Sequence, residues 1–179
     1  KYKHMKINTN SWNKIRYTIL TPVYDLIAGY FKESRKKSVD ALEIKVGDKV
    51  LIVGAGTGLD LAFLPNDCEI VATDITPAMI ERIKKRSSTS NRRVQAIVMD
   101  GQRLEFADNS FDKIILHLIL AVIPDPIACI KESERLLKPG GHIVVFDKFV
   151  RRDTKASMLR RVANLLTNLI FTDITRNFE

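Results

Sequence analysis

A short apolar run followed at once by alternating glycines constrains this chain most. Residues 50–53 are Val, Leu, Ile and Val, and glycines stand at positions 54, 56 and 58. An uninterrupted apolar run of this length is typical of a parallel strand that is buried on both faces. Glycines directly behind such a strand allow a tight turn into a helix, whose first backbone N–H groups have no partner within the helix. We therefore expect a ligand site at the carboxyl end of this strand.

Strand and helix patterns alternate along the chain. Further strands are expected at 69–73, 94–99, 112–117 and 143–146, and helices at 57–64, 77–86 and 126–137. This alternation predicts an α/β fold, a Rossmann-like, doubly wound, mostly parallel sheet with helices on both faces. The N-terminal flank predicts helix from about Trp12 to Leu42 with a break near Pro22, and the C-terminal flank predicts one from Thr154 to Phe171. The expected parts are a helical cap over 1–45, a ligand-binding core over 46–150 and a C-terminal helix over 151–179.

The composition argues against several classes of protein. No apolar run approaches the length of roughly 20 residues that a transmembrane helix needs. The two cysteines, Cys68 and Cys129, lack paired spacing, which disfavours both a disulfide framework and a zinc site. A cytoplasmic location fits this cysteine usage.

The net charge of +8 lies in the two flanks of the chain. Residues 1–49 carry 11 Lys/Arg against 5 Asp/Glu, residues 50–147 carry 11 against 13, and residues 148–179 carry 7 against 3. Such flanks can bind a polyanion, either nucleic acid or the anionic inner face of a membrane, which would make the protein peripheral there. The other interpretation is that the charge serves solubility alone.

Two carboxylates narrow the identity of the ligand. The dinucleotide fingerprint fails because Leu59 stands where its third glycine belongs, and the Gly-Lys-Ser/Thr of a phosphate loop is missing. Asp74 ends the second strand, 20 residues after Gly54, where a carboxylate can accept both hydroxyls of a ribose. Asp100 and Gly101 end the third strand, where an acidic side chain and a backbone N–H can read the edge of an adenine. Each Asp alone could equally be a loop or cap residue.

In this order and spacing, the motifs resemble those of class I methyltransferases that use S-adenosylmethionine. The matching segments are VLIVGAGTG (50–58), VATDITPAM (71–79), MD (99–100), FADNSFD (106–112), VIPDP (122–126) and LLKPGG (136–141). The resemblance implies that the glycine loop holds the methionine part of the cofactor, Asp74 the ribose and Asp100 the adenine amine. The cofactor-binding residues it implies are Gly54, Ala55, Gly56, Thr57, Gly58, Asp74, Ile75, Met79, Asp100, Gly101 and His117. It also implies a closing β-hairpin, before which this chain ends.

Within that family, the chain is similar to the branch that acts on ubiquinone and menaquinone precursors and on bacterial phosphatidylethanolamine. The resemblance implies a lipid or lipid-like methyl acceptor. Three residues are candidates for catalysis. Tyr24 could line the mouth of the pocket or pack the N-terminal helix, His117 could face the cofactor or be satisfied by backbone, and Asp147 could orient an amine or cap a loop.

Other functions remain open at this stage. Basic amphipathic helices in the flanks could lie on an anionic membrane, or their apolar faces could pack on the sheet or over the cofactor. An RNA methyltransferase is less favoured, because residues 116–119 lack the Asn/Asp-Pro-Pro-aromatic box of adenine-methylating relatives. The methyltransferase of a small soluble metabolite is a further alternative, whereas a non-catalytic module would need a damaged glycine loop.

Overall fold

A computed structural model describes residues 9–89 and 92–147 of the chain. Its helices are α1 (Asn10–Ala28), α2 (Lys32–Asp40), α3 (Pro77–Thr89) and α4 (Pro126–Leu136), with 3₁₀ turns η1 (Gly29–Phe31) and η2 (Leu59–Phe63). Its strands are β1 (Lys49–Val53), β2 (Glu69–Asp74), β3 (Val94–Val98), β4 (Phe111–His117) and β5 (Leu137–Phe146). The predicted C-terminal helix and its basic residues lie outside the described residues.

The five strands form one parallel sheet in the order β3-β2-β1-β4-β5. The central strand, β1, lies between β2 and β4, with Ile52 paired to Ala72 on one side and to Ile115 on the other. Both faces of β1 are buried, which is why this strand is an uninterrupted apolar run. The predicted Rossmann-like sheet with helices on both faces is confirmed.

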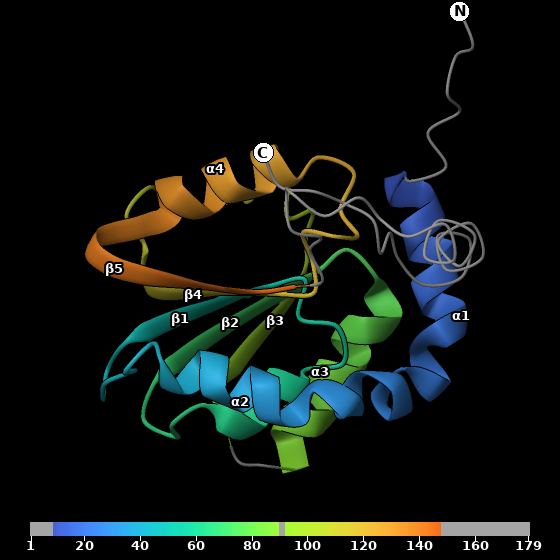
Figure 1. Cartoon of the computed structure of the whole chain (residues 1–179), viewed down its shortest axis with the longest axis horizontal. Coiled ribbons are helices and arrows are strands. Elements are labelled where there is room, and N and C mark those ends of the chain that lie inside the picture. The colour runs from blue at the N-terminus through green and yellow to red at the C-terminus, as the bar shows by residue number, and fades with distance from the viewer. Residues whose placement is uncertain (1–8, 90–91, 148–179) are drawn as a thin grey trace, which may run out of the picture.

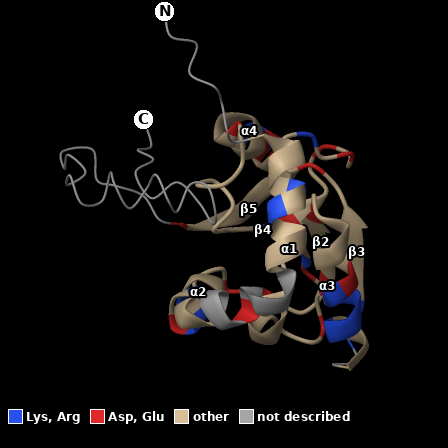
Figure 2. Ribbon diagram, turned by 90° about the vertical axis from the view of Figure 1, so that its right-hand side faces the viewer, with Lys and Arg blue, Asp and Glu red and all other residues tan. Residues whose placement is uncertain are grey.

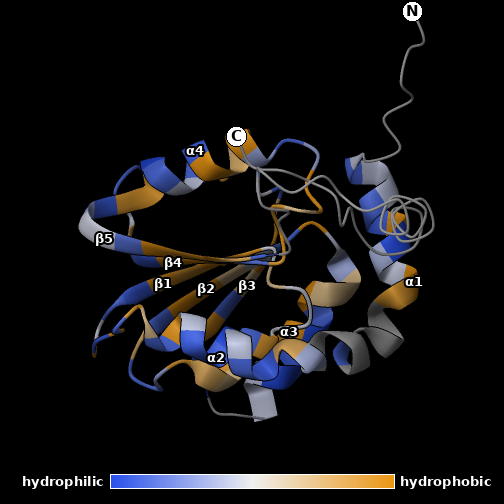
Figure 3. Ribbon diagram, viewed as in Figure 1, coloured by the Kyte–Doolittle hydropathy of each residue, from blue (hydrophilic) through white to orange (hydrophobic). Residues whose placement is uncertain are grey.

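Two apolar clusters fill the space on the two faces of the sheet. One cluster joins alternate residues of β1 and β2 to α2, η2 and α3, and includes Ile52, Ile80 and Ile83. The other joins the intervening strand residues to α4 and includes Leu51 and Leu136. Figure 1 shows α4 over one face and α2 with α3 over the other, and Figure 3 shows the apolar strands between them. The period-2 alternation of strand side chains thus assigns each residue to one cluster.

Local sequence signals set the helix ends. The Thr9 hydroxyl accepts a hydrogen bond from the Trp12 N–H at the start of α1. The Asp125 carboxylate accepts one from the Ala128 N–H at the start of α4, which has Pro126 in its first turn.

Two predicted helix boundaries are wrong. The helix expected at 57–64 is only the short 3₁₀ turn η2, because Gly58 is left-handed (φ 81°) and Leu64 is already extended. The break expected near Pro22 lies instead at η1, and α1 continues through that position. Helix α1 therefore extends across the carboxyl ends of the strands, as Figure 1 shows. No helix in the described part of the chain combines the length and apolarity that a membrane crossing needs.

Candidate functional site

A cleft of about 600 Å³, counted with its open mouth, lies at the carboxyl ends of β1, β2 and β3. Its walls come from the ends of the strands, the start of α3, the β4–α4 loop and α1. The lining residues are Asn10, Asn13, Tyr17, Gly54, Gly56, Asp74, Ile75, Thr76, Met79, Met99, Asp100, Gly101, Leu118, Ile119, Val122 and Ile123.

The glycine loop forms the floor of this cleft. Gly54 has φ 65°, and a β-carbon there would lie only 2.5 Å from Ile119 Cδ1. Gly56 also has a positive φ (56°), and its N–H donates to Asp74 Oδ2 over 2.9 Å. Only residues without a side chain allow this backbone to lie open to the cleft.

Three further residues of the predicted loop contact other parts of the protein and not the cleft. Ala55 is buried, and its N–H donates to the Thr73 carbonyl over 2.8 Å. The buried Thr57 donates its hydroxyl proton to Asp25 of α1, and Gly58 opens η2. These residues hold the loop in shape and are absent from the walls of the cleft.

Asp74 lies where a ribose acceptor was predicted. Its Oδ1 accepts the Thr76 N–H over 2.8 Å, and its Oδ2 accepts the Gly56 N–H. Burial raises the pKa of the Asp74 carboxyl above its ordinary 3.8, against the lowering effect of these two hydrogen bonds. The carboxylate is therefore fixed in orientation at the wall of the cleft, with Ile75 and Met79 beside it in the lining.

Asp100 is held by amide groups. Its Oδ1 accepts the backbone N–H and the side-chain Nε2 of Gln102 over 3.0 and 2.9 Å. Its Oδ2 accepts Asn10 Nδ2 over 2.6 Å. Gln102 in turn accepts the N–H of Asp125, the residue that caps α4. Asp100 and Gly101 both line the cleft, as the resemblance implied.

Helix α1 contributes one wall of the cleft through residues that the sequence analysis did not name. Asn10, Asn13 and Tyr17 follow the helical spacing of three and four residues and line the cleft together. Asn13 is buried, and its Nδ2 donates to the Val122 carbonyl over 3.2 Å. The available signal in the sequence was the pair of asparagines three positions apart on this amphipathic helix, Asn10 and Asn13, which could have indicated this wall.

The other end of α1 is tied to the core through Asp25. This carboxylate accepts the Thr57 hydroxyl of the glycine loop, and Arg86 Nη2 of α3 donates to it over 2.7 Å. The helix is thus fastened at Asn10 beside β3 and at Asp25 beside β1.

His117 does not lie in the cleft. It is 3% exposed, its Nδ1 lies 2.9 Å from Asp60 Oδ1, and its Nε2 lies 3.0 Å from Ser38 Oγ. Arg35 donates to the other oxygen of Asp60 over 2.7 Å. The prediction that His117 faces the cofactor is not what the structure shows, because its side chain points to the α2 face of the sheet.

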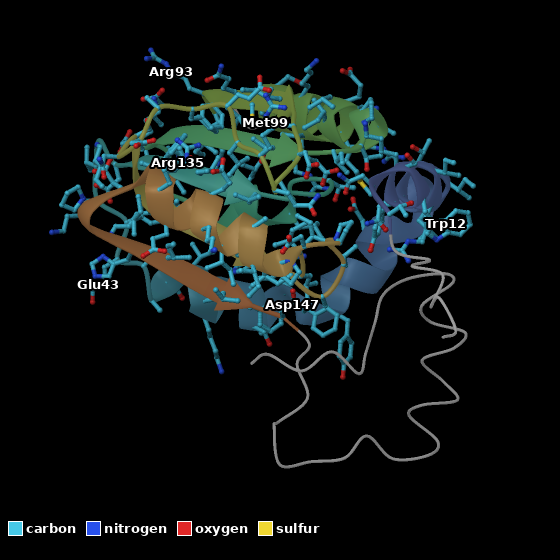
Figure 4. The ribbon with its side chains drawn as sticks, turned by 90° about the horizontal axis from the view of Figure 1, so that it is seen from above. Trp12, Glu43, Arg93, Met99, Arg135 and Asp147 are labelled. Atoms are coloured by element: carbon cyan, nitrogen blue, oxygen red, sulfur yellow. The ribbon has the colours of Figure 1, made fainter. Side chains whose placement is uncertain are left out.

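The two remaining catalytic candidates are placed less directly. Asp147 follows β5, and its Oδ2 accepts the Ala121 N–H over 2.9 Å, so it caps the loop behind the cleft (Figure 4). Tyr24 belongs to α1, but its side chain lies outside what the structure describes. Asp147 is not among the described residues that line the cleft.

Leu118 adds a strained backbone to the same wall. It lines the cleft with φ 58°, a conformation that L residues rarely adopt, and its N–H donates to the Phe146 carbonyl over 2.7 Å. Strain of this kind concentrates at ligand sites.

The residues present fit S-adenosylmethionine. The cleft has a floor at Gly54 and Gly56 that a side chain would fill, and one carboxylate for each of two polar parts of the ligand. The dinucleotide fingerprint still lacks its third glycine. Leu59 stands at that position, lies in η2 and is not among the described residues that line the cleft.

Comparison with known proteins supports the same assignment. A family model described as a methyltransferase domain matches residues 51–145. A phosphatidylethanolamine N-methyltransferase of Cereibacter sphaeroides is 28% identical over 131 residues, covering 72% of this chain and 64% of the relative. A demethylmenaquinone methyltransferase of Paenarthrobacter aurescens is 33% identical over 132 residues, covering 70% of this chain and 51% of the relative. The chain spans about half to two thirds of the length of these relatives.

The fold is shared more widely. The crystal structure of the cyclase SpnF superposes with a TM-score of 0.74 at 21% identity, covering 80% of this chain and 62% of that one. This likeness concerns the fold alone. The matched family spans more than half of the 179 residues, from β1 to β5. The chain therefore belongs to the methyltransferase domain family, the S-adenosylmethionine-dependent class that its motifs resemble.

Proposed function

We propose that this protein transfers the methyl group of S-adenosylmethionine to a lipid-like acceptor, a phospholipid amine above all, at a membrane surface. The observation that supports S-adenosylmethionine as the cofactor is the cleft in which the glycine loop, Asp74 and Asp100 meet. The acceptor rests on the two relatives, both named for lipid substrates, and on the surface of α1.

Different described residues would bind different parts of the cofactor. Gly54 and Gly56 would hold the methionine part, Asp74 the ribose hydroxyls, and Asp100 with Gly101 the adenine. The cofactor supplies a methyl group on a sulfonium, which is already activated for transfer. What the protein adds is placement of the acceptor in line with that methyl group, a proximity and orientation effect.

The lining of the cleft matches this demand. Its apolar residues, including Leu118, Ile119 and Val122, can exclude water, and none of the lining residues that the structure describes is a histidine. His117 and Asp147 are engaged in holding the fold. We therefore assign orientation, and no acid–base step, to the described part of the site.

The surface of α1 supports a membrane location. Ile15 and Ile19 are 54% and 72% exposed, and Lys14 is exposed beside them. Figure 2 shows basic residues on α1. Apolar side chains flanked by lysine on an exposed helix suit the interface of an anionic bilayer.

The test uses S-adenosylmethionine with a labelled methyl group and three acceptors in parallel. These are vesicles of phosphatidylethanolamine, the same vesicles with demethylmenaquinone, and total RNA. We expect label in the organic extract of a vesicle sample, in the lipid or in the quinone. Label in RNA alone would favour the nucleic-acid alternative. A cell extract serves as a further acceptor sample, and label found only in one of its water-soluble metabolites would favour the small-metabolite alternative. Either result would overturn the lipid proposal.

A further inference from the structure

Two side-chain oxygens at one end of the cleft, Asp100 Oδ2 and Asn10 Oδ1, accept fewer strong hydrogen bonds than they can. Asp100 Oδ2 carries one strong donor, Asn10 Nδ2 at 2.6 Å, and one long contact, Gln102 Nε2 at 3.2 Å. A carboxylate oxygen has two acceptor positions, so the weakly used one can take a further N–H. Asn10 Oδ1 accepts one hydrogen bond from the described residues, from Gln102 Nε2 at 3.1 Å, and an amide oxygen also has two acceptor positions.

We propose that Asn10, the first residue of α1, determines specificity for adenine together with Asp100. The proposal rests on the proposed function, since it concerns the cofactor of that site. The exocyclic amine of adenine has two N–H groups, which these two oxygens can accept side by side. A 6-oxo base such as hypoxanthine presents an oxygen there, and two acceptors would repel it.

The amide of Asn10 is fixed in orientation. Its nitrogen donates to Asp100 while its oxygen accepts from Gln102, so a rotation of the amide by 180° would break both hydrogen bonds. Gln102 is itself anchored, because its Oε1 accepts the Asp125 N–H over 2.8 Å. Asn10 therefore cannot turn its nitrogen to a 6-oxo base without losing two contacts.

The position of Asn10 relative to the cleft is also fixed. Asn13, one turn later, donates to the Val122 carbonyl, and Asp25 binds both the glycine loop and Arg86. These contacts hold α1 across the cleft, with Asn10 and Asp100 in the lining together. The N-terminal cap would thus take part in recognition of the nucleoside.

The experiment compares S-adenosylhomocysteine with S-inosylhomocysteine by calorimetry. The wild-type protein should prefer the adenine compound. In Asn10→Ala the dissociation constant of S-inosylhomocysteine divided by that of S-adenosylhomocysteine should fall roughly tenfold, the effect of one hydrogen bond to a half-buried acceptor. Ser11→Ala, an exposed neighbour on α1, is the matched control and should keep the wild-type ratio.

Each other outcome has a definite meaning. If Asn10→Ala weakens both ligands equally, Asn10 only fastens α1, and the proposal is wrong. If Asn10→Ala binds S-adenosylhomocysteine more tightly, Asn10 competes with the amine, which also overturns it. Failure of the wild-type protein to bind either compound would instead refute the proposed function. A melting temperature equal to that of Ser11→Ala shows that the variant is folded.

Discussion

Asp74 shows at the scale of one residue how the fold prepares a ligand acceptor. Two backbone N–H groups fix its oxygens, and it faces the cleft. Asp74→Ala should weaken S-adenosylhomocysteine binding by on the order of 1–3 kcal/mol, because ribose hydroxyls would lose a charged acceptor. Calorimetry measures this, with Asp67→Ala as a control at an exposed carboxylate. Equal affinity of the two variants would remove Asp74 from the site.

The raised pKa of Asp74 gives a second, pH-dependent prediction. Burial shifts the pKa of this carboxyl above 3.8. In the proposed function the ionised form accepts the ribose hydroxyls, so protonation should compete with the ligand and the affinity should fall as the pH drops through the raised pKa. The decline should therefore begin at a higher pH than an ordinary Asp would give. Asp74→Asn should bind more weakly at neutral pH and lack this decline, and circular dichroism at each pH checks that the fold persists.

His117 should matter for stability and not for ligand binding. Its ring joins Asp60 to Ser38 in the interior, and its removal leaves a buried Asp60 oxygen without that partner. His117→Ala should lower the free energy of unfolding by about 1–3 kcal/mol while the affinity for S-adenosylhomocysteine stays unchanged. Urea denaturation measures the first quantity, with the exposed His142→Ala as control. A stable variant with lost cofactor affinity would restore His117 to the site.

The contrast between Asp74 and His117 shows what sequence can predict at this scale. Asp74 was predictable because the carboxyl ends of parallel strands meet at one edge of the sheet. His117 also ends a strand, but it shares a face with Ile115, which belongs to the cluster under α2 and η2. Counting the strand alternation from Ile115 would have placed His117 on that face.

At the scale of elements, the loop after β1 tolerates no side chain at its first position. Ala at Gly54 would force φ 65° and bring its β-carbon within 2.5–3.0 Å of three Ile119 atoms. Gly47 has φ 84° but no atom within 4 Å, so Gly47→Ala adds backbone strain alone. Gly54→Ala should therefore be the less stable of the two and should lose ligand affinity, since Ile119 lines the cleft.

Thermal unfolding and calorimetry on this pair separate strain from crowding. Gly47→Ala should lose about 1–2 kcal/mol and keep its affinity for S-adenosylhomocysteine. If Gly54→Ala binds as well as Gly47→Ala does, the loop is not the floor of the ligand site.

The strands were the elements most open to prediction. Apolar runs and glycine or proline boundaries located β1 to β4 to within one residue at each end, because a buried strand has few alternatives. The helix after the glycine loop and the break in the N-terminal flank were not predicted correctly. The first depends on the backbone conformation at Gly58 and the second on that of residues 29–31. The wall formed by Asn10, Asn13 and Tyr17 depends on how α1 packs, which local patterns do not encode.

At the scale of the whole molecule, most of the positive charge lies outside the block that carries the motifs. The central block of residues 50–147 holds the glycine loop, Asp74 and Asp100 and has a net charge of −2, whereas the flanks carry +6 and +4. The N-terminal flank also lines the cleft through α1, so its charge cannot be tested independently of the ligand. The basic residues of the C-terminal flank, residues 148–179, can be replaced without changing any described residue that lines the cleft.

Vesicle sedimentation tests this separation directly. Each basic residue near an anionic surface contributes about 1 kcal/mol within a Debye length, and micromolar affinity needs about 8 kcal/mol in total. We expect the protein to sediment with anionic vesicles at low salt and to be released as salt rises. Replacing Arg151, Arg152, Arg160 and Arg161 by Ala should reduce sedimentation while cofactor affinity stays nearly constant. The matched control removes four exposed basic residues of the central block, Arg82, Lys84, Lys85 and Arg103, and should sediment like the wild-type protein. Equal losses in the two variants would show that only net charge matters, and a protein that stays in the supernatant while shifting RNA in a gel would assign the flanks to nucleic acid.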